Sequence, residues 1–145
     1  PYLLIELPVT HHPSGIEETL FAVQQQGCTP ILAHVERYPY VTEDPTLLYR
    51  WVSGGALAQI NAAGLIRGGH SAKVMARYIK WNLVHLLATD AHNLEHRTVN
   101  LREGYAALPG DTAARFRRNG IQVFLGQDLD PGEPIEPRYR FGRWV

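Results

Sequence analysis

The sequence predicts an α/β fold built on parallel strands. Short apolar runs alternate with longer amphipathic segments, which is the pattern of β/α units. The sequence contains no repeat of fixed period. Polar side chains also follow directly after three of the apolar runs. With 145 residues and 45% hydrophobic content, the chain can bury one ordinary core. We therefore expect a single globular domain or a piece of one.

Three apolar runs in the first half predict strands, at residues 2–5, 29–33 and 56–61. Two amphipathic segments predict helices, at residues 16–26 and 45–53. Ser14 is the expected N-cap of the first helix because Glu17 follows three residues later. The second helix should end at the glycine pair 54–55.

The second half contains the longest β run, residues 83–89, and three segments of helical pattern, residues 71–81, 101–108 and 111–118. A loop is expected around the glycine pair 68–69. Residues 121–125 fit a strand or a helix, and we favour a helix because their apolar side chains share one helical face. From Asp130 onward, Pro131, Pro134 and Pro137 predict a tail without regular structure, either wrapped over the domain or disordered.

The overall charge is balanced, with 14 basic and 14 acidic residues. This balance gives no strong field to recruit nucleic acid or an acidic membrane surface, and no apolar run approaches the roughly 20 residues of a membrane span. The lone cysteine, Cys28, excludes an internal disulfide and favours a reducing compartment. The sequence thus predicts a soluble cytoplasmic protein. Because Pro1 stands where Met is expected, the natural start is predicted to lie upstream.

Metal-binding types of side chain stand where three predicted strands end. Glu6 follows the first run, His34 follows the second, and Asp90 and His92 follow the run 83–89. In β/α barrels the C-terminal ends of parallel strands share one face, so these side chains should converge there. Alternate residues leaving a strand also point to the same side, which would let Asp90 and His92 reach adjacent ions.

Carboxylate and imidazole ligands together suit zinc, manganese or iron. Each residue also has an ordinary structural interpretation: Glu6 or Asp90 could cap a turn or helix, and His34 could be a buried histidine with satisfied hydrogen bonds. A purely structural explanation gives no reason for the same placement at three strand ends. The sequence therefore predicts a metal site.

Two arginines, Arg37 and Arg97, lie in the loops that leave these strand ends. Guanidinium groups beside metal ions suit a phosphate, whose oxygens accept paired hydrogen bonds. The alternative is that each is a surface arginine.

Three motifs in the same order resemble one family: 4–8 (LIELP), 33–38 (AHVERY) and 89–93 (TDAHN). They resemble the bacterial protein tyrosine phosphatases of the polymerase-and-histidinol-phosphatase (PHP) superfamily, encoded with capsule and exopolysaccharide genes. The resemblance runs from Tyr2 to about Leu125. Val35 departs from it, since the family usually has proline there.

The resemblance implies a distorted (β/α)7, TIM-like barrel holding up to three divalent ions, commonly manganese, with iron or zinc as alternatives. It implies that Glu6, His34, Asp90 and His92 are metal ligands, and that Arg37 and Arg97 hold the substrate phosphate. His11 resembles a histidine that faces the site in the family. Arg37, Arg97 and Asp90 are accordingly the candidate catalytic residues.

The first metal motif of the family, His-x-His, does not occur among these residues, and a β/α barrel needs about 250 residues. We therefore expect residues 1–127 to be the C-terminal portion of a PHP phosphatase domain and residues 128–145 to be a tail. The chain alone should have little turnover, and it could oligomerise or associate with the missing barrel portion.

The expected reaction is hydrolysis of phosphotyrosine esters, on the phosphorylated tail of the bacterial tyrosine kinase that regulates capsule or exopolysaccharide synthesis. The alternatives are a PHP phosphatase for a small metabolite, such as histidinol phosphate or a nucleotide, and a non-catalytic binding homologue. Cys28 lacks the phosphate-cradling loop and following arginine of a cysteine phosphatase.

Overall fold

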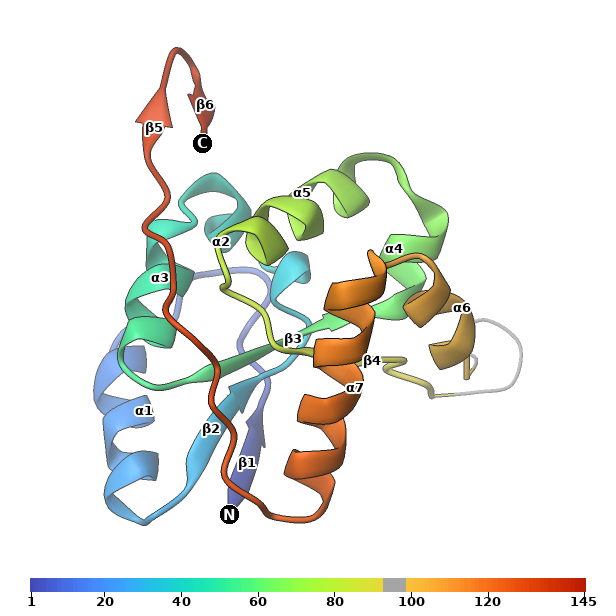
Figure 1. The fold of residues 1–145 in the computed structure, drawn as a ribbon. Helices are drawn as coiled ribbons and strands as arrows, with labels where there is room; N and C mark the ends of the chain where they lie inside the picture. Colours follow the sequence, from blue (N-terminus) through green and yellow to red (C-terminus); the bar gives the residue numbers. More distant parts are fainter. Residues whose placement is uncertain (93–98) are drawn as a thin grey trace.

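The computed structural model describes residues 1–92 and 99–145, and its centre is a parallel four-stranded sheet (Figure 1). The strands follow one another across the sheet in chain order: β1 (Tyr2–Ile5), β2 (Thr29–Leu32), β3 (Leu57–Asn61) and β4 (Leu86–Ala88). Each neighbouring pair is parallel. The predicted α/β fold with parallel strands is confirmed.

Helices connect the strands, as β/α units require. The described helical segments are α1 (Ile16–Gln25), η1 (Val35–Arg37), α2 (Pro39–Glu43), α3 (Thr46–Ser53), α4 (Ala62–Arg67), α5 (Gly69–Lys80), α6 (Leu101–Ala106) and α7 (Gly110–Phe124). Each is too short or too polar to serve as a membrane span in the part of the chain that the structure describes.

The two faces of the sheet are covered unequally. Successive strand residues point to opposite faces, and Leu32, Ala58 and Leu87 belong to the main hydrophobic core under the helices. The other face carries a small cluster of Ile31, Leu57 and Leu86, joined by partly buried side chains from β1, from α7 and from the segment after α7. Leu4 in β1 remains 60% exposed.

Several predicted boundaries were wrong for local reasons. Ser14 does not cap α1, because the N-cap position is Gly15 in a left-handed conformation without a side-chain bond. Neither α4, at residues 62–67, nor α2 was predicted, and α5 already begins at Gly69 of the glycine pair expected to form a loop. The predicted strand 83–89 is paired only at 86–88, since residues 83–85 lead out of the turn at Asn82, whose φ is 53°.

The helical interpretation of residues 121–125 is confirmed, because α7 runs without a break to Phe124. The tail does wrap over the domain, and the Ile135 amide donates to the Trp81 carbonyl at 2.8 Å. It is not wholly irregular: β5 (Tyr139–Arg140) and β6 (Arg143–Trp144) pair antiparallel. The prolines end at Pro137, so nothing prevents backbone pairing beyond it.

Candidate functional site

The residues predicted to bind metal follow the carboxyl ends of three strands, β1, β2 and β4, of the same parallel sheet. Glu6 directly follows β1, whereas His34 follows β2 and Asp90 follows β4 after one intervening residue. His34 and Asp90 have left-handed backbone conformations, with φ of 35° and 51°. Such conformations cost a non-glycine residue about 1–3 kcal/mol and cluster at functional sites.

Glu6 and His34 form a close pair. His34 Nε2 lies 3.2 Å from Glu6 Oε1, although the two side chains are exposed very differently, at 4% for His34 and 66% for Glu6. His34 Nδ1 is buried and has no hydrogen-bond partner among the residues described. The carboxyl ends of β1 and β2 thus place a carboxylate next to a buried imidazole.

Asp90 is the hub of the second group. Its Oδ2 accepts hydrogen bonds from Arg37 Nη1 at 3.1 Å and from Asn61 Nδ2 at 3.4 Å. His92 Nδ1 lies 2.7 Å from the Asp90 carbonyl oxygen and 3.6 Å from its Oδ1. Arg37, predicted to hold phosphate, therefore contacts a predicted metal ligand in this structure.

The four predicted ligands thus lie as two pairs. Within residues 1–92 and 99–145, no group of three His, Cys, Asp or Glu side chains is close enough to hold one ion. The exposed His11 has a ring nitrogen 3.1 Å from the Thr10 hydroxyl. Arg97 lies outside the described residues.

The geometry of the Glu6–His34 pair suits two of the ligands of one metal ion. Two ligand atoms at about 2.0–2.2 Å from one ion are separated by roughly 3.0–3.4 Å, and the 3.2 Å between Glu6 and His34 falls in this range. Carboxylate with imidazole is also the donor chemistry of zinc, manganese and iron sites.

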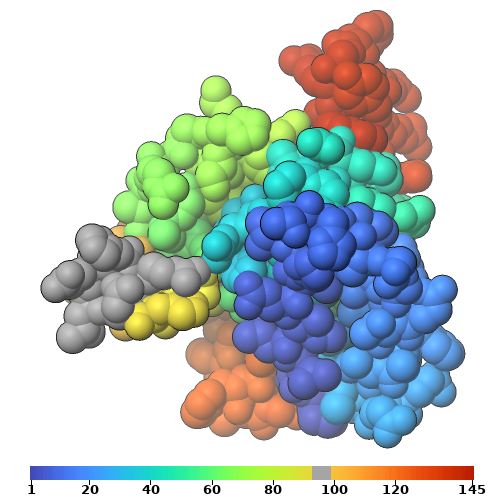
Figure 2. Space-filling model, turned by 180° about the vertical axis from the view of Figure 1, so that it is seen from behind, coloured from blue at the N-terminus to red at the C-terminus, as the bar shows by residue number. Residues whose placement is uncertain are grey.

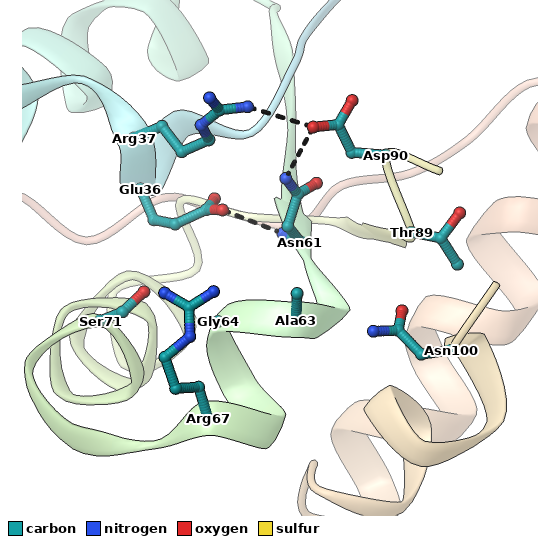
Figure 3. A pocket seen from close by; sticks show the side chains of 10 residues that line it. All are labelled: Glu36, Arg37, Asn61, Ala63, Gly64, Arg67, Ser71, Thr89, Asp90 and Asn100. Carbon is teal, nitrogen blue, oxygen red and sulfur yellow. Dashed lines mark hydrogen bonds and ion pairs between the residues drawn. The ribbon is translucent and has the colours of Figure 1, made fainter. Parts of the chain in front are cut away.

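A polar cavity of about 360 Å³ adjoins the second pair (Figure 3). Arg37, Asn61 and Asp90 form its upper side in that view, and α4 and α5 form the opposite side with Arg67 and Ser71. Asn61 is 7% exposed, and its Oδ1 has no partner among the described residues. A polar ligand beside Asp90 would therefore meet unsatisfied acceptors and a cation.

Glu36 is one of the residues of this cavity that were not predicted from the sequence. Its Oε1 accepts a hydrogen bond from the backbone N–H of Asn61 at 3.3 Å, while Oε2 is buried without a described partner. Burial raises the pKa of Glu36 to about 7. The available signal was its position between His34 and Arg37 in one short motif.

Tyr38 and Tyr40 follow closely after Arg37 in the sequence. Tyr38 is fully buried, and its hydroxyl accepts a hydrogen bond from the Leu7 amide at 2.9 Å. The Tyr40 hydroxyl donates to the Pro8 carbonyl at 2.8 Å, and its ring stacks on Tyr38. Both rings therefore fix the loop after β1, which carries Glu6.

Comparison with known proteins gives a consistent result. Residues 1–118 match the family model described as capsular polysaccharide synthesis, CpsB/CapC. The chain is 32% identical to the tyrosine-protein phosphatase YwqE of Bacillus subtilis, covering 97% of this chain and 59% of YwqE. It is 36% identical to the putative tyrosine-protein phosphatase CapC of Staphylococcus aureus, covering 99% of this chain and 58% of CapC.

A solved structure also matches, from a study of YwqE of Bacillus subtilis and CpsB of Streptococcus pneumoniae, described as unique metal-dependent tyrosine phosphatases. The TM-score is 0.84 at 31% identity, covering 92% of this chain and 57% of that one. The chain thus spans a little over half the length of these relatives. The match of the family model over most of the chain places it in the CpsB/CapC family of capsular polysaccharide synthesis proteins.

Proposed function

We propose that the chain is part of a metal-dependent protein tyrosine phosphatase that hydrolyses phosphotyrosine esters during capsule or exopolysaccharide synthesis. The observation that carries the proposal is the placement of Glu6, His34 and Asp90 after the carboxyl ends of strands β1, β2 and β4 of one parallel sheet, with Arg37 bonded to Asp90. The relatives named as tyrosine phosphatases support the substrate class.

The proposed architecture is the C-terminal portion of a distorted (β/α)7 PHP barrel, comprising residues 1–127, with residues 128–145 as a tail. Four consecutive parallel strands and a sparsely covered sheet face support it. The relatives are longer, with 58–59% of their length covered, which leaves room for further strands and ligands. The two described pairs of ligands would then be part of the complete site.

We propose manganese as the metal, held by Glu6, His34, Asp90 and His92 together with ligands from outside these residues. When bound, the ions would supply an activated water and neutralise charge that develops on the phosphate. Iron or zinc would suit the same ligands.

The chain itself would hold and orient the substrate. The Arg37 guanidinium has five donors and uses one of its nitrogens, Nη1, on Asp90, so it can offer other N–H groups to a phosphate oxygen. Asp90 positions Arg37 in turn, and Asn61 fixes Asp90 from the other side. Arg97 is proposed as the second phosphate ligand. His11, in the loop after Glu6, is proposed to face the substrate.

The proposed protein substrate is the tyrosine-phosphorylated tail of a bacterial tyrosine kinase, in the cytoplasm. The test uses the full-length protein purified with manganese available, and compares kcat/KM for a phosphotyrosine peptide with that for histidinol phosphate and a nucleoside monophosphate. Preference for the peptide is expected. Preference for a small metabolite would instead support a metabolite phosphatase, and absence of both stoichiometric metal and turnover would indicate a non-catalytic binding homologue.

A further inference from the structure

The C-terminal hairpin, residues 138–145, projects from the body of the molecule. Figure 1 shows it extending beyond the sheet and helices, and Figure 2 shows that its base rests against the rest of the molecule. At its tip Phe141 is 100% exposed, and Tyr139 in the adjoining strand is 62% exposed. The hairpin therefore presents aromatic surface away from the core.

The turn of the hairpin carries an unexpected residue. Phe141 and Gly142 connect β5 to β6 with φ of 52° and 78°. Two-residue turns with positive φ at both positions favour Asn-Gly, and a bulky side chain there is uncommon. Neither core packing nor turn geometry explains a phenylalanine at this position.

The hairpin is nevertheless held in place. The backbones of Arg138 and Val145 exchange hydrogen bonds of 3.0 and 2.9 Å. The rings of Tyr139 and Trp144 meet edge to face at 5.2 Å, and Trp144 Nε1 donates to the Glu43 carbonyl at 2.9 Å. Phe141 is thus presented from a supported strand pair.

Positive charge concentrates at the same place. Arg138, Arg140 and Arg143 are exposed and form no ion pair with any described residue. Arg138, Arg140 and Lys80 also line a groove of about 380 Å³, in which Glu136 is the acidic side chain among the described lining residues. The balanced charge of the whole chain conceals this local patch.

We propose that the C-terminal hairpin docks the protein peripherally onto an anionic membrane surface. Phe141 enters the interfacial region while the three arginines and Lys80 contact lipid phosphates. Aromatic and arginine side chains with apolar stems suit this interface, and basic clusters bind anionic lipid. Single-stranded nucleic acid is less well matched because such sites use several exposed rings in series along a groove, and Tyr139 packs on Trp144 here.

The test is co-sedimentation of the full-length protein with vesicles of phosphatidylcholine alone or mixed equally with phosphatidylglycerol. Binding to the mixed vesicles only is expected, and it should weaken as salt is raised. Phe141→Asn should reduce it about tenfold, and because asparagine suits the turn the hairpin should persist. The combined Arg138→Gln, Arg140→Gln and Arg143→Gln variant should reduce it about a hundredfold.

Two control variants remove an exposed aromatic ring or three positive charges from positions outside the hairpin. Phe21→Ser removes another exposed phenylalanine, and combined Lys73→Gln, Arg102→Gln and Arg118→Gln removes the same charge from other exposed positions. Both should bind as the parent protein does. The proposal is overturned if the parent fails to bind mixed vesicles or if the control charge variant loses binding equally. Hairpin-dependent binding of an oligonucleotide, or a hairpin-dependent dimer, in place of vesicle binding would also overturn it.

Discussion

At the scale of single residues, the contact between Arg37 and Asp90 joins a predicted phosphate ligand to a predicted metal ligand. Their atoms lie 3.1 Å apart, and the Asp90 side chain is 17% exposed. In the proposed function, Asp90 would bind both the Arg37 guanidinium and an ion, which would couple substrate binding to metal binding. A substitution of Arg37 therefore tests whether this arginine serves substrate binding or metal binding.

Arg37→Ala in the full-length protein should raise KM for a phosphotyrosine peptide by about tenfold to a hundredfold, because a charge-assisted hydrogen bond contributes about 1.5–3 kcal/mol. Metal content, measured by elemental analysis, should stay near that of the parent. Arg50→Ala, which removes a surface arginine paired with Glu17, is the matched control and should leave both quantities unchanged. Loss of metal in Arg37→Ala would make this arginine part of the metal scaffold.

His85 is a buried titratable group away from the predicted ligands. Its Nδ1 accepts a hydrogen bond from the Ala58 amide at 3.1 Å, and burial lowers its pKa from 6.5 to about 4. The neutral form is therefore favoured in the fold, and the unfolded chain binds more protons between these values. The stability that His85 contributes should fall as pH drops from about 6.5 to about 4, by roughly 3 kcal/mol in total.

Urea unfolding of the full-length protein across this pH range measures the loss. His85→Asn, whose side-chain oxygen can accept the same amide hydrogen, should flatten the pH dependence while lowering stability at neutral pH. An unchanged slope in this variant would show that other groups cause the acid sensitivity.

At the scale of elements, α6 lies unusually close to the sheet and to α4. A Cβ at Gly104 would be 2.5 Å from Ala62 Cβ and 3.1 Å from Leu87 Cδ2. Since α4 follows Asn61 directly, this contact fixes the helix that forms one wall of the polar cavity. Helix packing and cavity shape are therefore linked.

Gly104→Ala should destabilise the fold by about 1–3 kcal/mol through overpacking, measured by urea unfolding. Gly110→Ala is the matched control, because its Cβ would meet nothing within 4 Å and its φ is not positive. This control should change stability by less than about 1 kcal/mol. Equal effects in the two variants would show that α6 has room to shift.

At the scale of the molecule, Asn82 is one of the residues that hold the tail over the domain. Its Nδ2 donates to the carbonyls of Pro131 and Glu133 at 2.8 and 3.1 Å, and its Oδ1 accepts from Arg115. Asparagine also tolerates the left-handed backbone found there. Asn82 thus forms part of the turn after α5 and also anchors the segment that leads to the hairpin.

Asn82→Gly should loosen the tail without straining the turn, because glycine accepts the same backbone conformation. Hydrogen exchange of the Ile135 amide, bonded to the Trp81 carbonyl, should speed up about tenfold as two hydrogen bonds to the tail are lost. Amides in β2 should keep their rates. Unchanged exchange at Ile135 would show that the tail is held elsewhere.

The sequence by itself determined the parallel α/β fold, because hydrophobic periodicity is local, and it determined which side chains end the strands. Motif resemblance supplied the family, which the comparisons confirmed. Only the tertiary structure decided that Arg37 contacts Asp90, that Glu36 is buried beside Asn61, and that the basic hairpin projects. These features depend on which distant residues meet and which are removed from water, and neither periodicity nor composition contains that information.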